Sequence, residues 1–365
     1  MIKKFKVAAG IFTRKVFTGP LEVSIDVTNR CSLGCLTCWF YSPLQAEKVS
    51  NEWVKKEIDF ELFKKVVDEL KDMKVKNIML GGNGDPFMHP RIIDMIEYTK
   101  KRGFIVNTST CGVYFKEREL RNMLDLGIDS INVSILAATQ ETYLNMHNDK
   151  KRELFDKVKK NISLISEWKK KEKKRLPCIR LVNVICNLNY FEIDKMVNLA
   201  KEIGADEVGF KRLAIMPFTK KLLLTGDQIK ELAEILDIAD KKADLLRIAT
   251  NINDFRQNIM PGLISGDYTS DIYSRMPCYI GWIYSRILCD GNVVPCCGCC
   301  SYIIGNLHNN TFKEIWNSEI YREFRKKTIE IVENPSIKAE CACHTCVHVG
   351  SNRGIYRRMN FWKKV

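Results

Sequence analysis

The chain has 365 residues, which is enough for about two domains of ordinary size. Hydrophobic residues make up 45% and charged residues 28% of it, a balance that excludes a wholly disordered protein. No stretch approaches the roughly 20 apolar residues that a membrane helix needs, and the start of the chain does not have the pattern of a secretory signal. We therefore expect a cytoplasmic globular protein whose net charge of +14 attracts anions.

Short apolar strands alternate with amphipathic helices from residue 21 to about residue 213. The predicted strands are 21–27, 77–81, 104–110, 131–136, 179–185 and 207–213. The predicted helices are 59–73, 90–103, 116–127, 153–174 and 192–204. Strands separated by helices pair in parallel through right-handed crossovers. The sequence therefore predicts an α/β fold, either a doubly wound sheet or a full or partial (β/α) barrel.

The pattern changes after the last of these strands. A helix is predicted over 226–248, and a stretch rich in Gly, Ser, Asp and Pro over 261–277 is expected to be a linker. The remaining part is rich in cysteine and contains one predicted helix near 311–328. It has too little regular structure to fold without a crosslink such as a metal centre. The expected units are an N-terminal extension (1–20), an α/β core (21–215), a helical segment and linker (216–275), a small cysteine-rich domain (276–350) and a basic tail (351–365).

The fifteen cysteines are grouped along the chain. Their odd number and the lack of an export signal argue against a disulfide framework, and clustered cysteines in a cytosolic chain favour metal binding or redox chemistry. The three groups are Cys31, Cys35 and Cys38; Cys278, Cys289, Cys296, Cys297, Cys299 and Cys300; and Cys341, Cys343 and Cys346.

The first group, Cys31-x3-Cys35-x2-Cys38, directly follows the first predicted strand. In a parallel α/β architecture, the loop after a strand faces the active-site end. Structural zinc and a fully ligated [4Fe–4S] cluster both take four protein ligands, so three thiolates leave a position open for another ligand. A zinc knuckle completed by a distant residue and buried free thiols are the alternatives.

The second group surrounds Asp290-Gly291, a hairpin signal between two apolar runs that would bring Cys278 and Cys296 together. Cys343-x2-Cys346 could supply two more thiolates and close a cluster completely. Several alternatives remain open for the other cysteines. Cys341 competes with Cys343, whereas Cys289, Cys297, Cys299 and Cys300 could be ligands of a second cluster, a hydrogen-donating thiol or buried small residues. A zinc site with His344 or His348 is a further alternative.

The spacing of the first group resembles the CxxxCxxC signature of the radical S-adenosylmethionine (SAM) superfamily. The resemblance implies that residues 21–215 form a partial (β/α)6 TIM-like barrel and that Cys31, Cys35 and Cys38 hold a [4Fe–4S] cluster. In that family the open iron chelates SAM, whose reductive cleavage gives a 5′-deoxyadenosyl radical that abstracts hydrogen from the substrate. The resemblance assigns no other catalytic residue.

Later segments follow the order of the family's SAM-binding motifs. The run 81–86 is similar to the GGE-type motif, with Asp85 where Glu is commoner, and 108–112 is similar to the TNG turn. Thr37 departs from the family pattern, because an aromatic residue often precedes the third cysteine. The SAM-lining residues that the resemblance implies are Gly82, Asn83, Gly84, Asp85, Pro86, Thr108, Ser134, Asn187 and Gly209.

The cysteine-rich domain resembles the SPASM/twitch extension of the same superfamily. Its C-x9–15-G-x4-C pattern is met by Cys278, Gly291 and Cys296. The resemblance implies an auxiliary [4Fe–4S] cluster on Cys278, Cys296, Cys343 and Cys346. No cysteine follows Cys346, so one auxiliary cluster is expected, as in twitch-type members.

An auxiliary cluster suits removal of an electron from a substrate radical. Net oxidation of a small polar metabolite, such as a sugar or cyclitol, is the first expectation, and modification of a peptide or protein side chain is the alternative. Only about 20 residues precede the first strand, too few for a peptide-recognition domain. A zinc or electron-transfer protein without SAM chemistry is the third hypothesis.

The basic charge suits an acidic flavodoxin or ferredoxin as electron donor. Nucleic acid is not expected, because the sequence has no basic stripe interleaved with aromatic residues. His89 and His147 are either proton acceptors or packing residues, and Arg180 and Arg212 either reach a carboxylate inside the barrel or form structural pairs.

Overall fold

The computed structural model describes residues 2–149 and 151–362. In this part of the chain, one sheet has the strand order β10-β9-β8-β1-β2-β3-β4-β5-β6-β7. The strands from β8 to β7 are parallel to their neighbours, and β9 and β10 extend one edge antiparallel. Their bounds are β1 Glu22–Asp26, β2 Asn77–Gly81, β3 Ile105–Thr110, β4 Ser130–Ser134, β5 Cys178–Val184, β6 Glu207–Lys211, β7 Ala249–Thr250, β8 Tyr284–Ile287, β9 Asn292–Val294 and β10 Gly305–Asn306.

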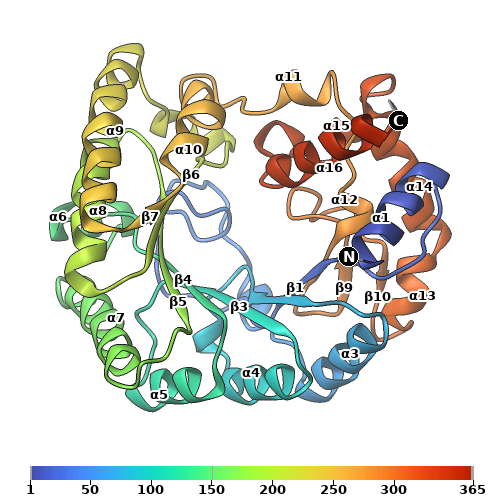
Figure 1. Cartoon of the computed structure of the whole chain (residues 1–365), viewed down its shortest axis with the longest axis horizontal. Helices are drawn as coiled ribbons and strands as arrows, with labels where there is room; N and C mark the ends of the chain where they lie inside the picture. The colour runs from blue at the N-terminus through green and yellow to red at the C-terminus, as the bar shows by residue number, and fades with distance from the viewer. Residues whose placement is uncertain (1, 150, 363–365) are drawn as a thin grey trace.

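The sheet curves into an arc, and helices cover its outer side (Figure 1). The helices that follow the barrel strands are α3 Phe60–Asp72, α4 Ile92–Lys101, α5 Glu117–Leu126, α6 Gln140–His147, α7 Glu153–Lys171, α8 Ile193–Ile203 and α9 Gly226–Leu246. The others are α1 Ile2–Thr13, α2 Asn51–Val54, α10 Ile252–Asn258, α11 Ser270–Tyr273, α12 Ile280–Ile283, α13 Phe312–Asn317, α14 Glu319–Ile329, α15 Ile337–Glu340 and α16 Val349–Trp362. This arrangement confirms the α/β class and the partial barrel.

Alternation along the strands separates an apolar face from a polar one. In β4, Ile131 and Val133 are buried in the core, whereas Ser130 and Asn132 point to the opposite face. Asn132 joins β4 to both neighbouring strands, because its amide donates to the Thr108 carbonyl (3.2 Å) and its Oδ1 accepts from Arg180 (3.1 Å). The inner surface of the arc is therefore a hydrogen-bonded polar lining.

The predicted barrel strands agree with the observed ones to within two residues at each end. The expectation of a linker over 261–277 is wrong, because this stretch carries α11 and buries Leu263, Tyr268, Tyr273 and Met276. Its Gly, Ser and Pro residues indicate turns, but its spaced apolar residues pack into the core. The single helix expected near 311–328 is divided at Ser318, whose side chain caps α14.

The cysteine-rich region continues the barrel sheet, since β8 pairs in parallel with β1. Two tryptophans tie this region to the beginning of the chain: Trp282 Nε1 donates to the Lys15 carbonyl and Trp316 Nε1 to the Thr18 carbonyl, each at 3.0 Å. Most of the expected basic tail belongs to α16, where Asn352 is fully buried. Among the described residues, no helix has the length and apolar character that crossing a membrane requires.

Candidate active site

The structure brings Cys31, Cys35 and Cys38 together in the loop after β1. Burial, with smaller contributions from the nearby Asp85 and Cys38, raises the pKa of Cys31 to about 12, although local backbone N–H groups oppose the rise. Burial also raises the pKa of Cys35, and Cys38 and Cys31 add to this rise. The three thiols therefore lie within electrostatic reach of one another, as ligands of one centre must.

The glycine-rich turn after β2 docks against the segment that leads into Cys31. The Gly84 N–H donates to the Thr28 carbonyl (3.2 Å), and the Asp85 N–H donates to the Arg30 carbonyl (2.8 Å). A Cβ atom on Gly84 would lie 2.3 Å from the Arg30 oxygen, which no side chain tolerates. Glycine is thus required here for close approach of two loops.

The Asp85 carboxylate is buried and joins two loops at the carboxyl ends of the strands. One oxygen accepts from the Phe87 N–H (2.9 Å), and the other accepts from the Thr110 hydroxyl (2.8 Å) and the Cys111 N–H (2.7 Å). Burial raises its pKa, although these donors oppose the rise. The structure thus gives Asp85 a positioning role, and its contact with SAM stays a prediction.

The other residues predicted to line SAM lie on the strands and loops around this end of the barrel. The Thr108 hydroxyl donates to the Leu80 carbonyl (2.9 Å), and Asn187 donates to the Lys221 carbonyl (3.0 Å) while its Oδ1 is buried without a partner. A Cβ atom on Gly209 would lie 3.5 Å from Arg180 Cδ. Ser134 ends β4, half-buried.

Both histidines named above take packing positions. His89 Nε2 lies 3.2 Å from the Ile58 carbonyl, and its Nδ1 accepts from the Arg91 N–H (3.1 Å). His147 is buried, bonds the Tyr143 carbonyl through Nδ1 (2.9 Å) and stacks on the Tyr143 ring with centroids 4.0 Å apart. Both ring nitrogens of His89 have partners, and the one free nitrogen of His147, Nε2, belongs to a side chain with no exposed surface.

A second group of thiols surrounds a cavity of about 60 Å³ in the cysteine-rich region. The predicted ligands Cys278, Cys296, Cys343 and Cys346 all line it. Several neighbours offer hydrogen bonds to their sulfurs: the Gly298 N–H reaches Cys296 (3.2 Å), Asn352 reaches Cys278 (3.7 Å), and the Tyr273 hydroxyl lies 3.0 Å from Cys346.

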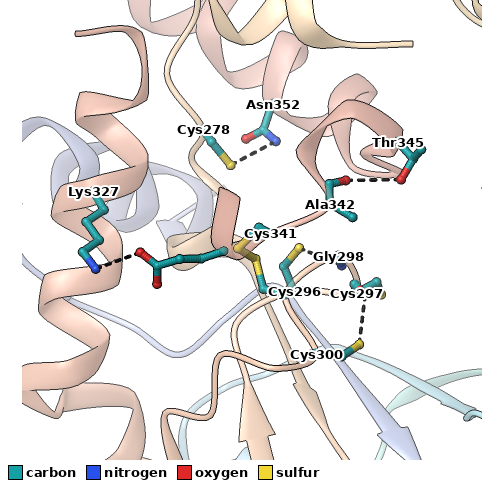
Figure 2. Close-up of a disulfide and its surroundings, with 12 residues drawn as sticks. Cys278, Cys296, Cys297, Gly298, Cys300, Lys327, Cys341, Ala342, Thr345 and Asn352 are labelled. Atoms are coloured by element: carbon teal, nitrogen blue, oxygen red, sulfur yellow. Dashed lines mark hydrogen bonds and ion pairs between the residues drawn. A yellow bond between two sulfur atoms is a disulfide. The ribbon is translucent and has the colours of Figure 1, made fainter. Parts of the chain in front are cut away.

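Cys299 and Cys341, which are 42 positions apart, form a disulfide beside this cavity (Figure 2). The sequence-based expectation that the cysteines do not form disulfides is wrong for Cys299 and Cys341. The Ala342 N–H donates to the Gly298 carbonyl (2.8 Å), and this backbone bond holds the two segments side by side. The bonded sulfur of Cys341 does not compete with Cys343 in this structure.

The remaining surplus cysteines lie near β8. The Cys297 sulfur is 3.0 Å from the Tyr284 hydroxyl, and the Cys300 sulfur is 3.5 Å from Arg286 Nη1. Cys289 is buried, and burial together with nearby Asp26 raises its pKa to about 12. At this pKa the Cys289 thiol is neutral at physiological pH.

Both cysteine groups offer the donor set that an iron–sulfur cluster takes. In the described part of the chain, no three Cys, His, Asp or Glu side chains converge on one point as ligands of one ion must. On tetrahedral zinc, thiolate sulfurs lie roughly 3.8 Å apart, whereas a [4Fe–4S] cube spreads its ligands over a larger volume. An all-cysteine donor set is the one that such a cube takes.

A buried ion pair, which sequence reasoning missed, connects the two sites. Asp26 at the end of β1 has 0% exposure and receives hydrogen bonds from Arg286 Nε (2.9 Å) and Nη2 (2.6 Å). The same guanidinium donates to Asn83 of the glycine-rich turn (2.6 Å) and lies near Cys300. The sequence feature that could have indicated this ion pair is Arg286, a charged residue within the apolar run 283–288.

A larger cavity, of about 380 Å³, lies between the two cysteine groups. Its wall includes Thr37 and Trp39, which flank Cys38, and Thr345 and Val347, which flank Cys346. Trp39, Thr345 and Val347 also line the smaller cavity. A molecule bound here would contact residues next to Cys38 and next to Cys346.

Comparison with known proteins identifies the family. A model of the radical SAM superfamily matches residues 25–200, and a model of the SPASM iron–sulfur cluster-binding domain matches residues 278–347. The chain belongs to the radical SAM superfamily. It is therefore an enzyme whose cofactors are a [4Fe–4S] cluster and SAM, and its SPASM domain indicates auxiliary iron–sulfur ligation. The hypothesis of a zinc or electron-transfer protein without SAM chemistry is wrong.

Curated relatives of this radical SAM enzyme match most of its length. It is 24% identical over 328 residues to the tungsten-containing aldehyde ferredoxin oxidoreductase cofactor-modifying protein of Pyrococcus furiosus, covering 82% of each chain. It is 22% identical over 326 residues to the PqqA peptide cyclase of Gluconobacter oxydans, covering 84% of this chain and 79% of the cyclase.

Solved structures share the fold. Streptococcus suis SuiB bound to S-adenosylmethionine has a TM-score of 0.65 at 14% identity, over 87% of this chain and 70% of SuiB. The enzyme anSMEcpe with bound AdoMet has a TM-score of 0.61 at 17% identity, over 85% of this chain and 81% of the other. The barrel and the cysteine-rich region thus follow an arrangement known from SAM-bound enzymes.

Proposed function

We propose that this radical SAM enzyme modifies a side chain of a peptide by net oxidation. The observation that carries the proposal is the cavity of about 380 Å³ bounded by neighbours of Cys38 on one side and of Cys346 on the other. A substrate held there would lie between the site of hydrogen abstraction and a second centre able to accept an electron. This geometry suits a reaction that removes a hydrogen atom and then an electron.

The comparisons favour a peptide over the sugar or cyclitol that the sequence put first. One relative is named a PqqA peptide cyclase, and the fold matches SuiB solved with the precursor peptide SuiA at a TM-score of 0.65. The fold also matches anSMEcpe solved with the Cp18Cys peptide, at a TM-score of 0.59. A small-molecule substrate is the second candidate, because the name of the Pyrococcus furiosus relative refers to a cofactor.

Within this proposal, Cys31, Cys35 and Cys38 hold the SAM-binding cluster. When bound, that cluster supplies the electron that cleaves SAM to methionine and the 5′-deoxyadenosyl radical. The turn around Gly84 and Asp85 fixes the loops against which SAM lies. Hydrogen bonds between these loops hold the thiols and the proposed SAM pocket in fixed positions relative to each other.

Cys278, Cys296, Cys343 and Cys346 hold the auxiliary cluster in this proposal. When bound there, that cluster would supply an acceptor for the electron left on the substrate after hydrogen abstraction, and the accompanying proton would leave to water. Trp39, Thr345 and Val347 line both cavities, so a substrate in the larger one would lie against side chains that also border the second centre. A flavodoxin or ferredoxin of acidic surface is the proposed donor, because the protein carries a net charge of +14.

Cysteine variants of the anaerobically reconstituted enzyme test the assignment. The parent should contain about eight irons per chain, four for each cluster. Cys35→Ala should lose 5′-deoxyadenosine formation, whereas Cys343→Ala should keep it but yield no oxidised peptide. Cys178→Ala is the matched control, because Cys178 is half-exposed at the start of β5, away from both groups. SAM cleavage that survives Cys35→Ala would contradict the assignment.

Peptide libraries test the substrate class. Incubation with SAM and a reductant should give a peptide lighter by two hydrogen atoms, together with 5′-deoxyadenosine above the peptide-free rate. The measurement is mass spectrometry of both products from the same reaction. If only small-molecule substrates raise the 5′-deoxyadenosine yield, the peptide proposal fails and the second candidate stands.

A further inference from the structure

The cavity between the two cysteine groups has a cationic lining. Lys211 and Arg212 enter it from the end of β6, and Arg353 enters it from α16. One carboxylate, Asp254 of α10, belongs to the same wall. Three cationic side chains against one acid leave a positive excess around a space large enough for a side chain and part of its backbone.

The Arg212 guanidinium has an unsatisfied hydrogen-bond donor. Its Nη1 is buried and has no hydrogen-bond partner among the described residues. The guanidinium carbon lies over the ring of Tyr268, 5.3 Å from its centroid, and the Tyr268 hydroxyl is buried without a partner as well. Buried donors of this kind are costly unless a ligand completes them.

Lys211 and Arg212 are two adjacent cations with a lowered pKa. Burial lowers the pKa of Lys211, and nearby Arg180 and Arg212 lower it further. Burial also lowers the pKa of Arg212, despite the opposing effects of Cys346 and Asp254. An anion beside Arg212 would replace the solvation that its buried Nη1 has lost, and the exposed Lys211 would add a second positive charge.

We propose that this cavity recognises a carboxylate of the substrate, the acidic side chain of a peptide, through Arg212 with help from Lys211 and Arg353. The inference rests on the proposed function and specifies its substrate class. A carboxylate accepts two parallel hydrogen bonds from a guanidinium, and the neighbouring cations add charge without fixing geometry. None of the residues predicted to line SAM belongs to this wall, which favours the substrate over SAM as the source of the carboxylate.

Peptide binding to the reconstituted holoenzyme with SAM tests the inference. The probes are N-acetyl-Gly-Glu-Gly-amide and its isostere N-acetyl-Gly-Gln-Gly-amide, which differ only in the charge of one side chain. The Glu peptide should bind at least about tenfold more tightly in calorimetry, and Arg212→Gln should remove this difference. Arg353→Gln should reduce it without abolishing it.

Arg256→Gln is the control. Arg256 lies on α10, as the cavity residue Asp254 does, but it pairs with Asp237 (2.7 Å) and does not line the cavity. Each variant is accepted only if its iron content and its SAM-induced change in the electron paramagnetic resonance spectrum match the parent. Equal affinity for the two peptides, or no binding of either, overturns the inference. Peptide oxidation in the library assay would then still support the proposed function, so the two failures are distinguishable.

Discussion

Breaking the ion pair between Asp26 and Arg286 should destabilise the protein strongly. Asp26 has no exposed surface, and the Arg286 side chain is 11% exposed. Two hydrogen bonds of 2.9 and 2.6 Å place the charge centres roughly 4 Å apart, where an effective dielectric of about 20 gives about 4 kcal/mol of attraction. Arg286→Met leaves Asp26 buried without a partner, so we expect a loss of about 3–5 kcal/mol.

The doubly substituted protein separates this reasoning from a simple packing effect. Asp26→Leu combined with Arg286→Met removes both buried charges, so it should recover most of the stability that the single change loses. The assay is urea unfolding under anaerobic conditions, followed by circular dichroism. Arg256→Met, which breaks an exposed pair with Asp237, is the control and should cost less than about 1 kcal/mol. If Arg286→Met costs no more than the control, the pair is not desolvated and the argument fails.

The remaining predictions concern the first site and its surroundings. Gly84→Ala should weaken SAM binding in electron paramagnetic resonance titrations, because its Cβ would meet the Arg30 carbonyl, whereas Gly226→Ala, with open space around it, should not. His147 has a pKa lowered by burial from 6.5 to about 4, so stability should fall by up to about 3 kcal/mol as the pH drops from 6.5 to 4. Burial raises the Cys31 pKa to about 12, so cluster assembly should release protons and proceed further at higher pH.

Each of these three predictions has a contradicting outcome. Equal SAM affinity of the two glycine variants would show that the loops around Gly84 are not rigid. The sign for His147 follows from a folded-state pKa below the unfolded one, so thermal melting should become less pH-dependent in His147→Gln, and an unchanged profile would refute it. Iron incorporation and proton release, measured together with a pH indicator, would refute the Cys31 prediction if both were independent of pH.

Local patterns predicted the barrel because each strand and helix carries its own periodicity. The apolar alternation of Ile131 and Val133, and the cysteine spacing after β1, are readable in short windows. The parallel pairing of β8 with β1 was not readable, because the choice of a strand's partner depends on contacts between residues 260 positions apart, such as Asp26 and Arg286. The pairing of Cys299 with Cys341 is non-local in the same way, and sequence alone does not give connectivity.

The two halves of the chemistry therefore differ in how the sequence encodes them. The three thiols of the first centre come from one loop of eight residues, whose spacing can be recognised without a structure. The large cavity is assembled from five distant stretches, near Trp39, Val184, Arg212, Asp254 and Arg353, and its cationic residues belong to no recognisable motif. Because α10 and α16 contribute to the cavity but hold none of the proposed cluster ligands, changes in these helices should alter which substrate binds while SAM cleavage continues.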